Sequence, residues 1–328
     1  DNLHADTMRL AAARATMPWV VLLISTYDLG RQPFGLASAA AALRAAGADV
    51  VCADLAKERL SEAAVARATA IAFFLPMHTA TRLAMPVIDH VRAVNPRARL
   101  IAYGLYAPLN ATLLREHGVS AIIGGEFEDA LVASVKEDAA PQTLGVPRVQ
   151  FLVPDRHGLP ALTTYATLQW GSERRTVGYT EASRGCKHRC RHCPIVPVYD
   201  GRFRVVPLDI VMADVRAQVA AGARHVTFGD PDFFNGIGHA LAIVDRFAGE
   251  FPGVSYDVTI KVEHLIQHAS ALTRLRDTGC AFVTTAVEAV DDRILARLEK
   301  GHTRADFERV VAETHAIGLT LAPTFVAF

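Results

Sequence analysis

The sequence has few cysteines, no excess of charge of either sign and no long hydrophobic run. The five cysteines are an odd number and three lie close together, so they do not make a disulfide framework. The 34 Lys and Arg residues balance 34 Asp and Glu residues, which leaves no net positive field to hold nucleic acid or an anionic membrane surface. We therefore expect neither nucleic acid nor a membrane as a partner.

The apolar runs are all too short to form a transmembrane helix. The first of them, residues 19–24, also lacks the small-residue cleavage site that follows the apolar part of a secretory signal. We expect a cytoplasmic protein, in which thiols stay reduced and are available as metal ligands.

The N-terminal part of the chain alternates short apolar runs with helical stretches. The composition, 51% hydrophobic and 21% charged over 328 residues, is that of a globular protein with about two domains. Buried strands are expected at 19–24, 49–53, 70–75, 98–103 and 119–123, with helices at 33–46, 61–68, 79–94 and 110–117. The pattern predicts an α/β domain with a doubly wound parallel sheet over residues 17–137, with its binding edge at the carboxyl ends of the strands.

A second alternation follows a proline-containing segment. Residues 138–176 show no helical period, and we expect a linker or a strap laid across a surface. Further strands are expected at 176–180, 224–228, 255–260, 281–286 and 319–322, with helices at 208–221, 238–250, 264–277 and 304–317. Repeated βα units predict a partial barrel over residues 177–328 with its chemistry at the strand ends. Five strands leave an open apolar edge, so we expect the barrel to be truncated at the C-terminus.

Three cysteines follow the first strand of this second series with the spacing C-x3-C-x2-C, at Cys186, Cys190 and Cys193. Thiolates at this spacing can close on one small inorganic cluster, and we expect the neighbouring Arg and Lys residues to lower the pKa values of the thiols. Three ligands leave one iron of a 4Fe-4S cluster open to a substrate or cofactor. The alternative is a structural zinc site with His188 or His192 as fourth ligand, which is disfavoured because no second pair of ligands follows.

The cysteine motif at the start of a βα series resembles the radical S-adenosylmethionine (SAM) superfamily. The resemblance implies a partial (βα)6 barrel and a 4Fe-4S cluster held by Cys186, Cys190 and Cys193. It also implies that the amine and carboxylate of SAM chelate the fourth iron, and that an electron from the cluster breaks a carbon–sulfur bond of the sulfonium. The cofactors then do the difficult chemistry, while the barrel orients SAM and excludes water.

The same resemblance implies a set of SAM-binding residues. His192 stands where the family usually has an aromatic residue near the adenine. Asp230 and Asp232 follow the second barrel strand, where acidic residues face the SAM amine, and carboxylates are suitable acceptors for an ammonium group. Glu288, after the fourth strand, matches a turn near the ribose or the carboxylate. No residue is singled out as catalytic.

Two further candidates lie after the third barrel strand. Lys261 and Glu263 are placed to bind SAM, or they form a plain ion pair at the rim of the barrel.

Cys52 and Cys280 lie in or beside predicted buried strands, and we interpret both as small core residues. Thr303 is expected to cap the helix that follows it.

An α/β domain followed by such a barrel resembles the cobalamin-binding-domain subgroup of the superfamily, and the likeness covers nearly the whole chain. The D-x-H-x-x-G signature that supplies a histidine to cobalt is absent, and the nearest string, residues 155–158, has the wrong spacing. Two alternatives follow: the N-terminal domain binds cobalamin without a histidine ligand, or it is a vestigial or repurposed fold.

Three stretches carry a narrower resemblance: GYTEASRGCKHRCRHCP, FGDPDFFNG and TIKVEHL. They resemble a bacterial group with Cys- or selenocysteine-bearing tails (CUAEP/CCAEP type), to which the radical SAM enzyme of arsinothricin biosynthesis is similar. This implies transfer of the 3-amino-3-carboxypropyl group of SAM to arsenite in antibiotic biosynthesis, with flavodoxin or ferredoxin as electron donor. The alternatives are a cobalamin-dependent methyltransferase, a 5′-deoxyadenosyl-radical enzyme acting on an organic substrate, or a non-catalytic iron–sulfur or zinc sensor.

Overall fold

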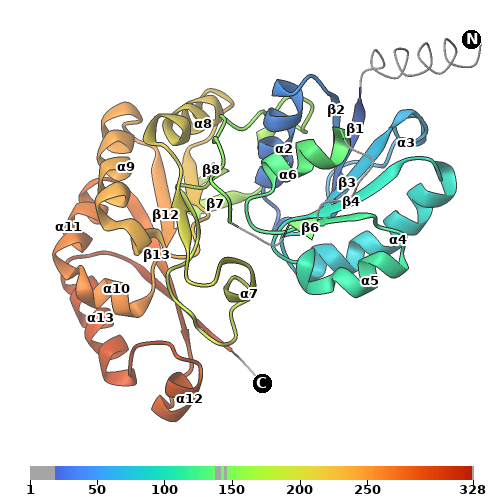
Figure 1. Ribbon diagram of the computed structural model, residues 1–328. Coiled ribbons are helices and arrows are strands. Elements are labelled where there is room, and N and C mark those ends of the chain that lie inside the picture. The colour runs from blue at the N-terminus through green and yellow to red at the C-terminus, as the bar shows by residue number, and fades with distance from the viewer. Residues whose placement is uncertain (1–18, 137–141, 144–145, 327–328) are drawn as a thin grey trace, which may run out of the picture.

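Two α/β domains lie side by side in the computed structural model, which describes residues 19–136, 142–143 and 146–326 (Figure 1). The N-terminal domain contains a parallel sheet with the strand order β2-β1-β3-β4-β5-β6. The strands are β1 (Val20–Ser25), β2 (Asp49–Asp54), β3 (Ala70–Phe74), β4 (Arg99–Tyr103), β5 (Ala121–Ile123) and β6 (Gln142–Thr143). The doubly wound sheet predicted from the sequence is confirmed.

Helices cover both faces of this sheet because its strands are apolar on both sides. Val21 and Leu23 of β1 pack with α2 (Phe34–Ala45) and α6 (Glu128–Lys136) in one core. Leu22 and Ile24 face the opposite way. They pack with α3 (Glu62–Arg67), α4 (His78–Val94) and α5 (Ala111–Glu116) in a second core. The carboxyl ends of the strands remain free to line a binding edge.

The C-terminal domain contains a curled half-barrel sheet with the order β14-β13-β12-β11-β8-β7. Its strands are β7 (Thr167–Trp170), β8 (Glu173–Thr180), β11 (His225–Phe228), β12 (Ser255–Thr259), β13 (Cys280–Glu288) and β14 (Leu321–Phe325). Only β7 runs antiparallel to its neighbour. The helices are α8 (Leu208–Ala220), α9 (Ile237–Glu250), α10 (Val262–Gln267), α11 (Ala269–Asp277), α12 (Asp292–Arg297) and α13 (Arg304–Ala316).

The elements differ from the sequence-based expectations in a few places. The helix expected over 264–277 is two helices, α10 and α11, which meet at His268. The sequence also gave no sign of α6, α12 or the antiparallel pair β9 (Ser183–Gly185) and β10 (Phe203–Val205). No helix among the described residues is both long and apolar enough to cross a membrane.

The segment expected as a linker is built into both sheets, since β6 and β7 belong to it. Between them, the chain runs along the junction of the domains. The Asp155 N–H donates to the carbonyl of Ala37 at 2.9 Å. The Arg156 guanidinium reaches Gln32 in the N-terminal domain at 2.9 Å and Asp214 in α8 at 2.9 Å. These contacts connect the two domains; the boundaries at residues 137 and 177 stay a prediction.

Candidate metal and cofactor site

The three clustered cysteines lie in an excursion of the chain after β8. This excursion contains β9, the cysteine loop, α7 (Val196–Tyr199) and β10, and the pairing of β9 with β10 closes it. Gly185 enters the loop with φ +75°, and a Cβ there would collide with the Tyr199 ring and the carbonyl oxygen of Arg202. The Cys193 N–H donates to the carbonyl of Cys190 at 3.1 Å, which folds the loop back on itself.

The sulfurs line a cavity of about 210 Å³ at the carboxyl ends of the barrel strands, which we call the cysteine cavity. Cys186, Cys190 and Cys193 all contribute to its wall. The other polar groups in the wall are His188, His192, Asp232, Lys261, Glu288 and Lys300. The spacing of the cysteines and their position after the first parallel strand therefore bring them to a single cavity, and their role as cluster ligands stays a prediction.

The thiols of Cys186 and Cys193 do not have the lowered pKa values expected from the basic loop. Burial raises the pKa of Cys186 to about 11 and also raises that of Cys193. The guanidinium groups of Arg189 and Arg191 are 65% and 70% exposed and pair with acids on the surface. Because these two thiols are protonated without a metal, cluster binding must release their protons.

Asp230 is held by the start of the cysteine loop. Its carboxylate accepts hydrogen bonds from the Ser183 hydroxyl at 2.5 Å and from the Ala182 N–H at 2.9 Å. The group is almost fully buried, and burial raises its pKa to about 6. Since both oxygens already have partners, Asp230 contributes more directly to the position of the loop than to binding a ligand.

Asp232 lies two residues further along and points elsewhere. One oxygen accepts the Phe234 N–H at 3.2 Å as an N-cap, and the other lies 2.7 Å from His264 Nδ1. Lys261 lines the cysteine cavity, with its ammonium 2.7 Å from Glu263 and 3.1 Å from His188 Nδ1. The predicted Lys261–Glu263 ion pair is therefore present in the structure. Whether it also contacts SAM stays a prediction.

Two other residues of the cysteine cavity, His192 and Glu288, contact each other: His192 Nε2 lies 3.1 Å from the Glu288 carboxylate. Glu288 has φ +71°, an uncommon conformation for a residue with a side chain, at an irregularity in the pairing of β13 with β14. Lys300 is 4% exposed, and its ammonium is 3.6 Å from the same carboxylate. The sequence did not identify Lys300. The one feature of the sequence that could have marked Lys300 as a residue of the site is its place beside Gly301 in a tight turn.

The donor set fits an iron–sulfur cluster with one open iron. The three cysteines are free thiols in one cavity, and the Cys186 sulfur lies 3.7 Å from Asn235 Oδ1, a long contact that a metal can replace. Neither imidazole considered as a fourth ligand beside the cysteines is directed to them, because His192 faces Glu288 and His188 faces Lys261 and His264. Lys261 and Lys300 provide positive charge beside a thiolate-bound cluster.

A larger cavity of about 380 Å³ lies between the two domains, and we call it the interdomain cavity. Aromatic side chains from both domains line it: Phe34, Phe74, Phe127, Tyr179 and Tyr199. Arg31 also lines it and stacks over the Tyr179 ring at 4.6 Å. Among the described residues of its lining there is no histidine, so a corrinoid bound here would lack an imidazole ligand to cobalt.

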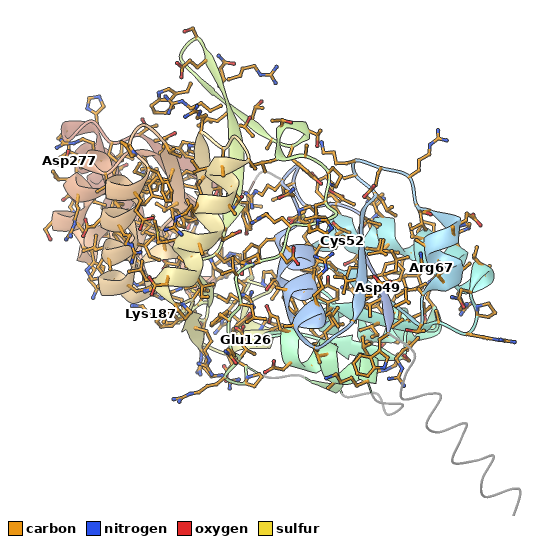
Figure 2. All side chains as sticks on the ribbon, turned by 90° about the horizontal axis from the view of Figure 1, so that it is seen from above. Asp49, Cys52, Arg67, Glu126, Lys187 and Asp277 are labelled. Carbon is orange, nitrogen blue, oxygen red and sulfur yellow. The ribbon has the colours of Figure 1, made fainter. Side chains whose placement is uncertain are left out.

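A buried charged group joins the N-terminal domain to the cysteine loop. The Arg184 guanidinium contacts Glu128 at 2.7 Å, Glu181 at 2.7 Å and Glu126 at 3.1 Å. Burial raises the pKa of Glu181 to about 7, and that of Glu126 is also raised. Glu126 lies on the side of the N-terminal domain that faces the other domain (Figure 2). Arg184 precedes Cys186 by two residues, so this group helps to fix the cysteine loop.

Comparisons with known proteins agree with this geometry. Residues 180–326 match the family model of the radical SAM superfamily. The tRNA-2-methylthio-N(6)-dimethylallyladenosine synthase of Chlorobaculum tepidum is 30% identical over 152 residues, which are 44% of this chain and 34% of that protein. The chain thus matches only about a third of the length of such curated relatives.

Two solved structures share the fold of both domains. One is the methyltransferase TsrM from Kitasatospora setae with cobalamin and a 4Fe-4S cluster bound, with a TM-score of 0.68, 17% identity and coverage of 94% of this chain and 66% of that one. The other is the cobalamin-dependent enzyme OxsB with cobalamin and SAM bound, with a TM-score of 0.72, 14% identity and coverage of 97% and 50%. At these identities the likeness establishes the fold alone.

Proposed function

The chain carries a domain of the radical SAM superfamily over residues 180–326, in the two-domain fold of cobalamin-dependent radical SAM enzymes, and from this premise we propose that it reductively cleaves SAM. The observation that carries the proposal is the convergence of Cys186, Cys190 and Cys193 in one cavity with polar groups opposite them. When bound, the cluster supplies the electron for cleavage of the sulfonium.

The residues of the chain hold and orient the reactants. Cys186, Cys190 and Cys193 would hold the cluster. Opposite them, Glu288 and Lys261 present a carboxylate and an ammonium, which suit the amine and the carboxylate of a methionyl group. His192 offers a flat ring for an adenine. One side of the cavity is formed by the cysteine loop, from Cys186 to Ile195.

The acceptor would be a small molecule in the interdomain cavity, with flavodoxin or ferredoxin as the electron donor. Ile195 lines both cavities, and the interdomain cavity is aromatic, which favours an organic or weakly polar acceptor. The narrower hypothesis, transfer of the aminocarboxypropyl group to arsenite, needs soft ligands for arsenic. Within the described residues, the only thiols that line either cavity are the three proposed cluster ligands.

A second candidate is a cobalamin-dependent reaction, because the N-terminal domain shares its fold with TsrM and OxsB. Because no histidine occurs among the lining residues that the structure describes, cobalamin would bind there without an imidazole ligand to cobalt. The non-catalytic alternative is a sensor that uses the three cysteines for an iron–sulfur cluster or for zinc.

Product analysis under anaerobic conditions separates these functions. The reduced, cluster-loaded protein is incubated with SAM, with or without arsenite and with or without cobalamin, and the nucleoside products are quantified. We expect SAM-derived 5′-deoxyadenosine or 5′-methylthioadenosine. Methylthioadenosine formed only with arsenite supports the arsenic reaction, and a methylated acceptor formed only with cobalamin supports the second candidate. A loaded and reduced protein that leaves SAM intact would refute SAM cleavage.

A further inference from the structure

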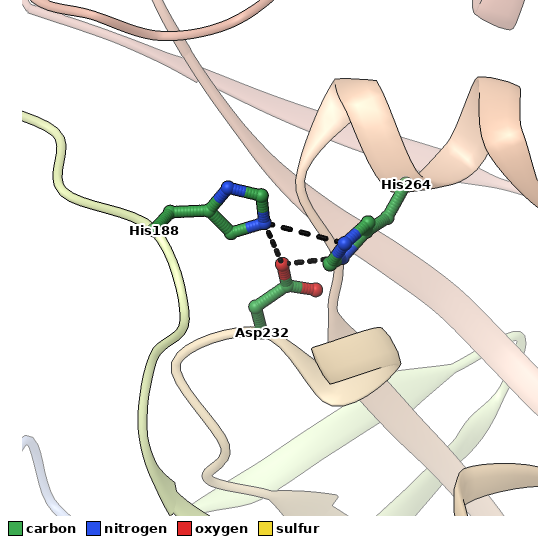
Figure 3. A group of neighbouring side chains, drawn as sticks. All are labelled: His188, Asp232 and His264. Carbon is green, nitrogen blue, oxygen red and sulfur yellow. Dashed lines mark hydrogen bonds and ion pairs between the residues drawn. The ribbon is translucent and has the colours of Figure 1, made fainter. Parts of the chain in front are cut away.

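Three metal-ligating side chains converge beside the cysteine cavity without belonging to the cysteine motif. They are His188 of the cysteine loop, Asp232 after β11 and His264 of α10, which follows β12 (Figure 3). Their ligand atoms all lie within 4.8 Å of one another. Because β8, β11 and β12 are neighbours in the sheet, the loops after them bring these three residues together.

The distances suit one ion. His264 Nδ1 is 2.7 Å from Asp232 Oδ2, and His188 Nε2 is 3.6 Å from the same oxygen. For nitrogen and oxygen ligands that each lie about 2.1 Å from a metal, the ligand atoms are separated by roughly 3 to 3.5 Å. Small rotations of the two rings would bring the three atoms to such a separation.

The hydrogen bonding of the group is incomplete. Asp232 Oδ2 and His264 Nδ1 lie 2.7 Å apart, yet neither makes a well-aligned hydrogen bond, and both residues are nearly fully buried. A buried polar atom without a partner lowers the stability of the fold, and a buried carboxylate does so strongly. A divalent cation would satisfy both atoms and balance the carboxylate charge.

The surroundings of His188 also suit a ligand. Metal-bound imidazoles usually donate their second N–H to a carboxylate. Glu263 Oε2 lies 3.6 Å from His188 Nδ1, and Lys261, which now faces the same nitrogen, keeps Glu263 as its partner at 2.7 Å. His188 Nδ1 can therefore carry a proton that faces Glu263 while its Nε2 binds a metal.

We propose that His188, Asp232 and His264 bind one divalent first-row transition-metal ion, separate from the iron–sulfur cluster. Two imidazoles and a carboxylate favour ions such as Zn²⁺, Fe²⁺ or Mn²⁺ over Mg²⁺ and Ca²⁺, which prefer oxygen ligands only. His188 and Asp232 line the cysteine cavity, so the remaining coordination positions of the ion face that cavity. They would accept an oxygen or nitrogen atom of a small-molecule ligand.

Cobalt(II) titration of the cluster-loaded protein tests this proposal. With the cysteines occupied by the cluster, the wild type should bind one equivalent of Co²⁺ and show visible d–d absorption without a sulfur-to-cobalt charge-transfer band. His264→Gln should weaken binding by at least the roughly 100-fold that losing a hydrogen-bond partner of a ligand can cost. His268→Gln is the matched control, since His268 lies on the same side of the sheet with its ring 5.8 Å from that of His264.

Iron and sulfide are measured in parallel, so the result does not depend on SAM cleavage. His188→Gln, in the loop, serves if His264→Gln does not fold by circular dichroism. A wild type that binds no Co²⁺ overturns the proposal, and so does equal binding by the folded ligand variant and His268→Gln. Elemental analysis of the protein as purified then identifies the natural ion.

Discussion

The two sheets of this protein are both built from parallel strands alternating with helices, but they carry different residues at the carboxyl ends of these strands. In the N-terminal sheet, the ends carry glycines and aromatic rings, such as Gly35, Phe74 and Phe127 around the interdomain cavity. In the C-terminal sheet, the corresponding loops carry three thiols, carboxylates, ammonium groups and imidazoles. The ends of parallel strands therefore provide a place for a functional site but do not determine its function. Whether the site binds a ligand or does chemistry depends on the side chains placed there.

The cysteines show the same contrast within a single residue type. Cys52 lies inside β2 and Cys280 begins β13, and both are buried in apolar cores. Figure 2 places Cys52 well within the N-terminal domain, apart from Lys187 in the cysteine loop. A thiol inside a strand is a core residue, whereas a thiol after the end of a strand is available to a metal.

The largest expected effect is loss of the iron–sulfur cluster, and it should separate the loop cysteines from the core cysteines. Cys190→Ala should reduce iron and sulfide to background and bring SAM cleavage below detection, because a cluster needs all three thiolates. Cys52→Ala should keep full iron content and lower the free energy of unfolding by about 1 kcal/mol, since it removes one small buried group. Iron analysis and urea unfolding measure both. Full iron content in Cys190→Ala would overturn the ligand assignment.

The next largest effect is the loss of stability on removing Arg184, which connects the N-terminal domain to the cysteine loop. Arg184→Leu would leave Glu126, Glu128 and Glu181 buried without their cation, which should lower the free energy of unfolding by about 3 to 5 kcal/mol at pH 8. The loss should shrink at pH 5, where the acids with raised pKa values take up protons. Urea unfolding at both pH values measures it.

Arg246→Leu is the control for that change, because Arg246 pairs with Glu250 and Asp209 on an exposed surface. Exposed pairs contribute little to stability, so no measurable change is expected. If the two variants were equally stable, the buried group would not be what holds the cysteine loop against the N-terminal domain.

Much of this organisation could be predicted from the sequence. The apolar runs and helical stretches located the strands of both sheets to within a few residues, except β6 and β7, because strands buried on two faces leave a strong local pattern. The cysteine motif could be identified because its ligands lie within one loop. The capping role of Thr303 is confirmed for the same reason, since a cap depends on the next three residues only.

What the sequence did not reveal depends on contacts between distant segments. Lys300 and Glu288 are brought together by the return of the chain after α12, and no local pattern marks this. Asp230 and Asp232 look alike in the sequence, yet one fixes the loop and the other faces His264. The pKa values of Cys186 and Cys193 were predicted in the wrong direction, since burial outweighs Arg189 and Arg191, whose side chains are exposed.

Two buried aspartates, one from each region, should respond differently to removal of charge. Burial raises the pKa of Asp28 to about 7, so its contribution to stability is complete below its unfolded pKa near 4 and is lost as the pH rises through 7. Asp28→Asn removes this ionisation and should make the protein more stable at pH 8 by roughly 2 to 4 kcal/mol, with a flatter pH dependence.

Asp230→Asn should stabilise the protein less than Asp28→Asn at pH 8 and should destabilise it at pH 5. Burial raises the pKa of Asp230 only to about 6, so less is gained at pH 8 by removing its charge. Asn has only one acceptor oxygen, so the Ser183 hydroxyl and the Ala182 N–H no longer each have an acceptor oxygen, which costs about 1 to 3 kcal/mol. Thermal unfolding between pH 5 and 8 measures both variants. An Asp28→Asn protein that is less stable than the wild type at pH 8 would show that the Asp28 carboxylate is stabilised by Arg31 rather than destabilised by burial.

The smallest expected change in unfolding free energy comes from removing a helix N-cap, and each domain offers one such cap. Thr303 makes a complete capping box with Asp306 at the start of α13, whereas Ser61 makes a single bond to the Ala64 N–H, at 3.3 Å, at the start of α3. Thr303→Ala should therefore lower the free energy of unfolding by about 1 kcal/mol and Ser61→Ala by about 0.5 kcal/mol. Urea unfolding at pH 7 can resolve this difference. Because both helices lie on the outside of their sheets, neither change should alter iron content. Loss of iron in Thr303→Ala would mean that the turn from Lys300 to Thr303 controls the cysteine cavity through Lys300 and Glu288.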